Sequence, residues 1–129
     1  MTKEKIAEIR TQLIAGALYR SDIKQAKDYL SQLESSADNA PWWRGYISAV
    51  RSSVRAVETD DKLSFIVTAI RGGFTPQRLR ELSKNFEARS SHTFRSEKER
   101  GYNKAWTDLL EGLAKAVAEN MLLTKTEEE

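Results

Sequence analysis

The sequence predicts an all-α fold in which five or six antiparallel helices form a single bundle. Apolar residues recur at steps of three and four along most of the chain, which is the spacing of one helix face. No run of alternating β-branched residues bounded by turns indicates a strand. The 129 residues, 40% of them hydrophobic, suit one domain, which we place at residues 1–123. Residues 124–129 are expected to form a frayed acidic tail.

The first two helices are expected to pair as a hairpin. The first spans residues 3–19, with Thr2 as its N-cap. Its expected apolar face consists of Ile6, Ile9, Leu13 and Leu18. Ser21 and Asp22 interrupt this pattern as capping residues, and a second helix follows. The second apolar face consists of Ile23, Ala26, Leu30 and Leu33. Because the turn is so short, the two helices must be antiparallel, and the third should pack back upon them.

Two further helices are expected between residues 41 and 73. Pro41 suits the first turn of a helix, because its missing N–H would have no partner there. The apolar face of that helix consists of Trp43, Tyr46, Ile47, Val50, Val54 and Val57. A shorter helix, capped by residues 59–61, follows with Leu63, Ile66, Val67 and Ile70. One glycine of the pair Gly72-Gly73 can take the left-handed conformation that ends a helix.

The last two helices begin with clear capping signals. Thr75 followed by Pro76 starts the fifth helix. Its apolar residues are Leu79, Leu82 and Phe86. The pattern is lost over residues 88–95, and Ser96 with Glu99 then forms a capping box. The longest helix follows, with an apolar stripe of Tyr102, Trp106, Leu109, Leu110, Leu113, Val117 and Met121.

The first hairpin resembles a tetratricopeptide repeat. Gly16, followed three residues later by Tyr19, matches the small and aromatic pair of that family's first helix. Ala26, Leu30 and Leu33 match the small residue and the two later apolar positions of its second helix. The resemblance covers roughly residues 10–70, and it implies a protein-binding scaffold with a concave groove and no catalysis.

The chain also departs from the repeat pattern. The connection from Gly16 to Ala26 is two residues shorter than in the family, and no Trp precedes Gly16 at the expected offset. Pro41 falls later than the family's terminal proline, and a second copy at an offset of 40 residues matches only at Leu63, Ile66 and Ile70. An irregular helical bundle therefore stays open as the alternative.

Two short segments repeat within the chain, near the starts of two long helices. Residues 44–46 and 100–102 both read Arg-Gly-Tyr. Glycine near a helix start costs up to about 1 kcal/mol relative to alanine, so its double use needs a packing explanation. We expect another helix to cross closely at Gly45 and at Gly101.

Composition excludes several kinds of chemistry. With no Cys and only His92, the chain offers no disulfide, thiol chemistry or histidine-rich metal site, and we expect no cofactor and no enzymatic activity. No stretch approaches eighteen apolar residues, and the first fifteen carry charges instead of a secretory apolar run. We expect a cytoplasmic protein that does not associate with membranes.

The strongest charge bias lies in residues 71–104, which carry nine basic residues against four acidic ones. Within it, hydroxyl groups, cations and an aromatic residue gather at a helix start, a combination that suits a phosphate or a single-stranded nucleic acid. The candidate anion- or nucleic-acid-binding residues are Arg89, His92, Phe94, Arg95, Lys98 and Arg100. The alternative is a capped and salt-bridged helix start, because Glu97 and Glu99 lie among the cations.

Trp42 is the other unusual residue. Only one of two adjacent indoles can face the core at a helix start, and Trp43 is in register with the apolar face. We therefore expect Trp42 at the surface, where a Trp often anchors an interface, with Arg44 beside it; burial of Trp42 against the second helix is the alternative. The sequence favours a non-enzymatic module that binds a protein partner, including a second copy, over an RNA- or DNA-binding domain.

Overall fold

The computed structural model describes residues 1–128, with side chains through residue 125, and within them helices are the only regular secondary structure. The helices are α1 (Lys3–Tyr19), α2 (Ile23–Ser36), α3 (Pro41–Glu58), α4 (Phe65–Arg71), α5 (Pro76–Ser90) and α6 (Glu97–Glu128). The predicted all-α bundle is therefore confirmed.

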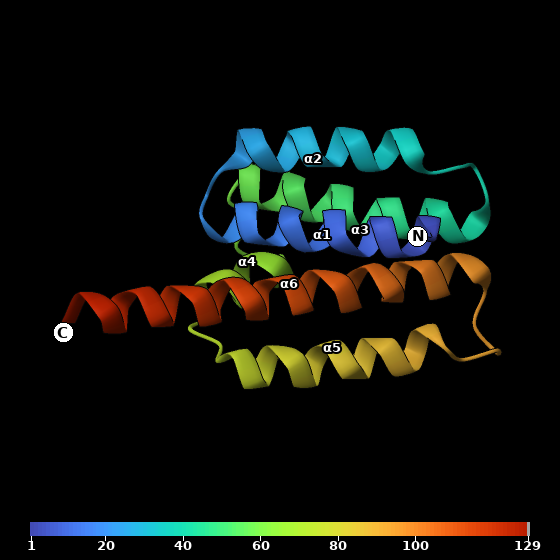
Figure 1. Cartoon of the computed structure of the whole chain (residues 1–129). Coiled ribbons are helices and arrows are strands. Elements are labelled where there is room, and N and C mark those ends of the chain that lie inside the picture. The colour runs from blue at the N-terminus through green and yellow to red at the C-terminus, as the bar shows by residue number, and fades with distance from the viewer. Residues whose placement is uncertain (129) are drawn as a thin grey trace.

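The helices pack around α6. Figure 1 shows α1, α3 and α6 running in one direction, whereas α2 and α5 run in the opposite direction. α6 packs against α1, α3 and α5, while α2 covers α1 and α3. The short α4 packs on α3. The far end of α6 projects beyond the other helices (Figure 1).

Most of the predicted helix ends are confirmed by their capping bonds. In each case a side-chain oxygen at the N-cap accepts a hydrogen bond from the backbone N–H three residues later, at 3.1–3.2 Å. The residues that do this are Thr2, Asp22, Thr75 and Ser96. Pro41 occupies the first turn of α3. Gly73, with φ of 68°, supplies the predicted left-handed residue after α4.

The start of α4 differs from our prediction. The side chain of Asp61 accepts from the backbone N–H of Leu63 at 3.1 Å, which forms a local turn instead of a helix cap. The helix begins later, at Phe65, after Ser64 as its N-cap residue. Leu63 consequently falls in the turn and is 96% exposed, so its predicted place on the buried face of a helix is wrong.

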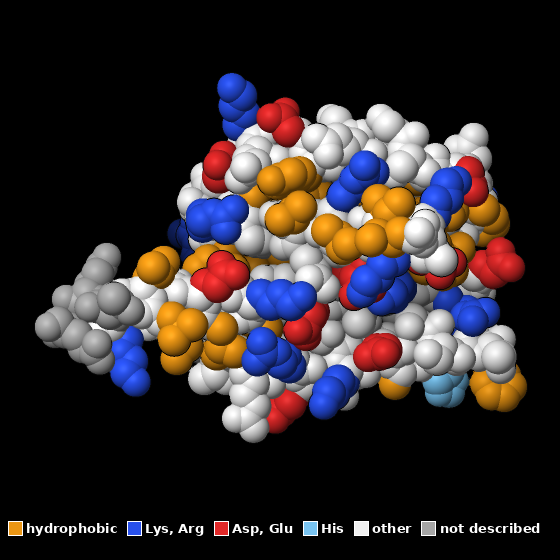
Figure 2. Space-filling view, viewed as in Figure 1, with side chains coloured by type: hydrophobic (Ala, Val, Ile, Leu, Met, Phe, Trp, Pro, Cys, Tyr) orange, Lys and Arg blue, Asp and Glu red, His pale blue; other side chains and the backbone are white. Residues whose placement is uncertain are grey.

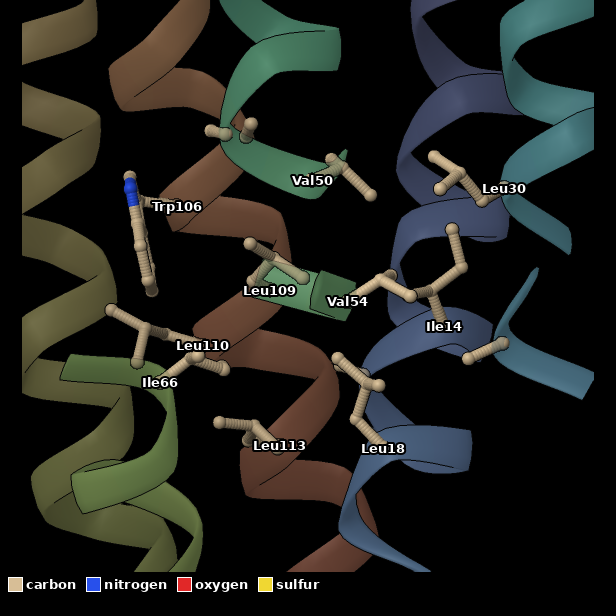
Figure 3. Packing of buried hydrophobic residues seen from close by; sticks show 14 of the residues in the cluster. Ile14, Leu18, Leu30, Val50, Val54, Ile66, Trp106, Leu109, Leu110 and Leu113 are labelled. Atoms are coloured by element: carbon tan, nitrogen blue, oxygen red, sulfur yellow. The ribbon is translucent and has the colours of Figure 1, made fainter. Parts of the chain in front are cut away.

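The core is built around the middle of α6, as the stripe on that helix predicted. Trp106, Leu109 and Leu110 are at least 93% buried. Figure 3 shows Leu109 directed toward Val54 of α3, and Leu110 beside Ile66 of α4. The stripe does not extend to its predicted ends, because Tyr102 and Met121 are 42% and 56% exposed.

The buried face of α1 agrees with our prediction at Leu18, which is fully buried, but differs from it at two of the other predicted positions. Ile9 and Leu13 are 42% and 44% exposed, whereas Ala7, Thr11 and Ala15 are buried. α6 approaches so closely here that a Cβ on Gly112 would lie 2.8 Å from the Cβ of Ala15. The contact between the two helices therefore favours small side chains at these positions, and Ile9 and Leu13 face outward.

α6 continues through most of the segment for which we predicted fraying. The helix ends at Glu128, and residue 129 lies outside the described residues. No described helix is both long enough and apolar enough to span a lipid bilayer.

Candidate functional site

Trp42 and Arg44, the predicted partner-binding residues, lie in the first turn of α3. Trp42 does not stand free at the surface as we expected. Its half-buried indole stacks on Tyr46, with ring centroids 5.3 Å apart and planes at 18°, and meets Trp43 edge-on at 4.8 Å. The stacking follows from helical spacing, because residues i and i+4 lie on one face. Trp42 therefore packs onto the core.

Arg44 is exposed and lines a groove of about 290 Å³ between α2 and α3. Other charges in this groove already have partners: Glu34 lies 2.6 Å from Arg51. A hydrogen bond from the backbone N–H of Ala40 lowers the pKa of Asp38. Trp42 does not line this groove, so the structure does not join it with Arg44 in one surface.

Three of the predicted anion-binding cations contact other parts of the chain at the α5–α6 connection. Nε of Arg100 donates to a backbone carbonyl in the last turn of α5, at 3.1 Å. The guanidinium of Arg89 lies over the ring of Phe86 at 4.9 Å. Arg95 lies 3.6 Å from Glu99. These contacts are those of a capped and salt-bridged helix start, the alternative that we considered.

The other three predicted residues, His92, Phe94 and Lys98, are exposed to solvent. His92 and Phe94 lie in the exposed α5–α6 connection, with ring centroids 6.2 Å apart, and Phe94 is 93% exposed. Lys98 is exposed on the first turn of α6 and lines a groove against α3 together with Arg95. Of the six predicted residues, the structure therefore brings two, Arg95 and Lys98, into one hollow.

A polar cluster that the sequence analysis missed lies inside the bundle. The hydroxyl of Tyr46 is 2.6 Å from Oδ2 of Asp108 and 2.8 Å from Oγ1 of Thr11. Nζ of Lys104 donates to Oδ1 of Asp108 at 2.9 Å. The four side chains join α1, α3 and α6, and Asp108 is only 2% exposed. The sequence did contain one sign of this cluster. Lys104 and Asp108 stand four residues apart on a predicted helix, where they can pair, and apolar residues follow Asp108 directly.

The protonation of this cluster is set by burial and by its hydrogen bonds. Burial raises the pKa of Asp108, although hydrogen bonds from Lys104 and Tyr46 act in the opposite direction. Burial alone would lower the pKa of Lys104, but the bond and the attraction to Asp108 outweigh it and raise that pKa. Burial and the carboxylate of Asp108 raise the pKa of Tyr46 well above its ordinary value.

A polar groove of about 310 Å³ opens next to this cluster. Lys104 and Asp108 line it together with Glu8, Glu87 and other polar residues of α1, α5 and α6. Both carboxylate oxygens of Asp108 already accept hydrogen bonds, which suits a group that joins helices. Within the described residues, no three His, Cys, Asp or Glu side chains are grouped so that they could hold a metal ion.

The outward-facing apolar residues of α1 line a second groove, between α1 and α6, of about 350 Å³. We call it the α1–α6 groove, and its lining residues are Ile9, Gln12, Leu13, Gly16, Arg20, Gly112, Lys115, Ala116 and Glu119. Gly16 and Gly112 carry no side chain, so Ile9 and Leu13 supply the largest apolar area. Figure 2 shows hydrophobic side chains over α1, with Lys and Arg side chains among them.

The projecting end of α6 also carries an exposed apolar side chain. Leu123 follows Ala116 and Glu119 at steps of three and four, so the three residues lie along one face of the helix. Leu123 is 66% exposed. Figure 2 shows hydrophobic side chains near this end of α6 also. The end of α6 that projects beyond the other helices therefore carries an exposed apolar residue on the face that lines the groove further up.

Comparisons of the chain with protein-family models, with curated proteins and with solved structures found no match.

Proposed function

We propose that this chain is a non-enzymatic helical interaction module that binds a protein partner in the α1–α6 groove. The observation that carries this proposal is the exposure of Ile9 and Leu13 on α1, which line this groove together with Gly112 and Ala116 of α6. Large apolar side chains exposed together along a groove are typical of an interaction surface. An amphipathic helix fits such a groove with residues at i, i+3, i+4 and i+7.

The charges of the groove favour a partner helix with acidic residues beside its apolar stripe. Arg20 and Lys115 flank the apolar floor, against one carboxylate, Glu119. Both cations bond only to neutral amides within the described part of the chain: Arg20 to Gln25 at 3.5 Å and Lys115 to Gln12 at 2.6 Å. Their charges are therefore available to an acidic partner, which they would attract and orient.

A synthetic amphipathic peptide tests this fit directly. We expect a helix with a leucine stripe and flanking glutamates to bind the chain, and its lysine-flanked counterpart to bind at least tenfold more weakly. Leu13→Glu should abolish binding, because it places a carboxylate in the apolar floor. Leu63→Glu makes the same change at an exposed leucine outside the groove and should have no effect. Equal binding of both peptides, or equal effects of both variants, would contradict the proposal.

Binding of RNA or DNA through residues 71–104 is the second candidate function. The observation that favours it is Phe94, a 93% exposed aromatic ring with His92 beside it, in the α5–α6 connection within this basic stretch. Exposed aromatic side chains interleaved with cations stack on the bases of single strands. The tetratricopeptide resemblance likewise remains a prediction, and it agrees with a protein-binding role.

A further inference from the structure

A groove of about 370 Å³ lies between the first turns of α3 and α6, and we call it the α3–α6 groove. Its lining residues are Gly45, Ser48, Arg95, Lys98, Glu99, Tyr102 and Asn103. α4 packs on α3 nearer the other end of the bundle, where Ile66 lies beside Leu110 (Figure 3). The short α4 leaves the first turns of α3 and α6 uncovered, and Tyr102 is consequently exposed.

Asn103 is the residue that distinguishes this groove from ordinary surface. It is 93% buried, yet its side-chain amide makes no hydrogen bond within the described chain. No fully enclosed polar side-chain atom among the described residues lacks a partner, so the amide of Asn103 is accessible to solvent, and Asn103 lines the α3–α6 groove. An accessible amide that makes no hydrogen bond within the protein has its donors and its acceptor available to a ligand.

The cations of the groove lie at and just before the start of α6, and its aromatic and amide side chains lie one turn further along the helix. Arg95 and Lys98 supply positive charge at the start of the helix, against one carboxylate in the groove, Glu99. The helix dipole at this end also favours an anion. Tyr102 lies one turn further, about 6 Å along the axis, with its ring 42% exposed. Asn103 lies beside Tyr102 and offers one acceptor and two donors.

We infer that the α3–α6 groove binds a nucleotide, as a free mononucleotide or as the terminal nucleotide of a single strand. The phosphate lies at Arg95 and Lys98, the base stacks on Tyr102, and Asn103 hydrogen-bonds the edge of the base. One helical turn separates the cations from the ring, which is the separation that one sugar spans. Arg95 leaves its exposed contact with Glu99 to reach the phosphate, a contact that little free energy maintains.

Titration with mononucleotides, followed by the backbone amide NMR signals of residues 45–48 and 98–103, tests this site. We expect the 5′-monophosphates of adenosine, guanosine, cytidine or uridine to shift these signals. At least one should bind about tenfold more tightly than its nucleoside or ribose 5-phosphate. No shift at millimolar concentrations, or equal binding of either fragment, would overturn the inference.

Variants distinguish binding in the α3–α6 groove from a general effect of the protein's charge. Lys98→Glu and Tyr102→Ala change exposed residues and should each weaken binding at least tenfold. Asn103→Leu keeps the size of the side chain and should weaken binding while the other signals stay in place. Lys84→Glu, the same charge change at an exposed position on α5, is the matched control and should leave binding unchanged. If Lys84→Glu weakens binding as much as Lys98→Glu, the site is overturned.

A 5′-phosphorylated single-stranded tetranucleotide separates the two sources of the ligand. Tighter binding of the tetranucleotide would assign the groove to the end of a strand, and equal or weaker binding would assign it to a free nucleotide. Leu13→Glu, which lies in the α1–α6 groove, should not change either result. The nucleotide site and the protein-binding groove can therefore fail independently.

Discussion

Gly45 and Gly101 lie at matching positions where α3 crosses α6. A Cβ on Gly45 would be 1.9 Å from the carbonyl oxygen of Lys98, and a Cβ on Gly101 would be 1.9 Å from that of Trp42. Each glycine thus packs against the carbonyl three residues before the other glycine. The repeated Arg-Gly-Tyr segments form the two halves of this crossing, and the close approach predicted for each glycine is confirmed.

Gly45→Ala should destabilise the protein, because the new methyl group cannot fit against the backbone of α6. We expect a loss of about 1–3 kcal/mol in the free energy of unfolding, typical of an overpacked core. Gly16→Ala is the control. Its Cβ would lie 3.2 Å from the end of the flexible Arg20 side chain, so the better helix propensity of alanine should give a gain of up to about 1 kcal/mol. Chemical denaturation measures both, and equal effects would contradict the crossing.

Trp106→Ala should be among the most damaging single changes. Trp106 is 93% buried, stacks on Phe86 with centroids 5.9 Å apart, and meets Phe65 edge-on at 5.5 Å. Removing a buried indole typically costs about 3–5 kcal/mol. Leu63→Ala, at a 96% exposed position, should change stability by no more than about 0.5 kcal/mol. Similar losses for the two variants in thermal unfolding would show that the buried face is wrongly assigned.

Tyr46→Phe tests the buried polar cluster through its pH dependence. At neutral pH the variant should lose about 1–3 kcal/mol, because Asp108 keeps its burial but loses one hydrogen-bond donor. The raised pKa of Tyr46 gives the wild type a contribution that is complete below pH 10 and is lost as the pH rises through the folded-state pKa.

The stability difference between wild type and Tyr46→Phe should therefore shrink above pH 10, as measured by urea denaturation over a pH series. Lys104 is present in both proteins, so its own titration contributes to both curves. A difference that stays constant or grows above pH 10 would rule out the proposed role of the hydroxyl.

The charge reversal of Arg95 and Lys98 separates the two readings of the basic stretch. If the stretch binds RNA or DNA, the double change to Glu should abolish retention of a single strand in a filter assay, and wild-type retention should fall steeply with salt. If it is only a salt-bridged helix start, the change should cost little stability, because the Arg95–Glu99 pair is exposed. No retention by wild type at about 50 mM salt, where electrostatic binding is strongest, would remove this candidate.

The sequence predicted the helices better than it predicted their faces. Capping residues such as Thr2 and Thr75 act locally, so their positions could be found without knowledge of the partner helices. The buried face of α1 depends on how closely α6 approaches, which no local pattern contains, so Ile9 and Leu13 were wrongly placed inside. The predicted exposure of Trp42 failed because its indole stacks on Tyr46, one turn further along the same helix.

The grooves could not be predicted for a related reason. Each is formed by residues distant in sequence, such as Leu13 with Lys115 and Ser48 with Asn103, that meet only when the helices pack. The buried position of Asp108 could not be predicted either, because it depends on a hydrogen bond from Tyr46 on another helix. Only its i, i+4 relation to Lys104 was visible in the chain itself.

Site-specific photo-crosslinking in the native cell tests the protein-binding proposal most directly. A photoreactive amino acid at Leu13 should form a covalent adduct of defined mass with a partner, and the adduct should disappear when Ile9 is also changed to Glu. The same photoreactive group at Leu63, which is exposed but outside the groove, should form no such adduct. Absence of any adduct at Leu13, or the same adducts at both positions, would contradict a partner in the α1–α6 groove, and an adduct of two copies of this chain would contradict a heterologous acidic helix.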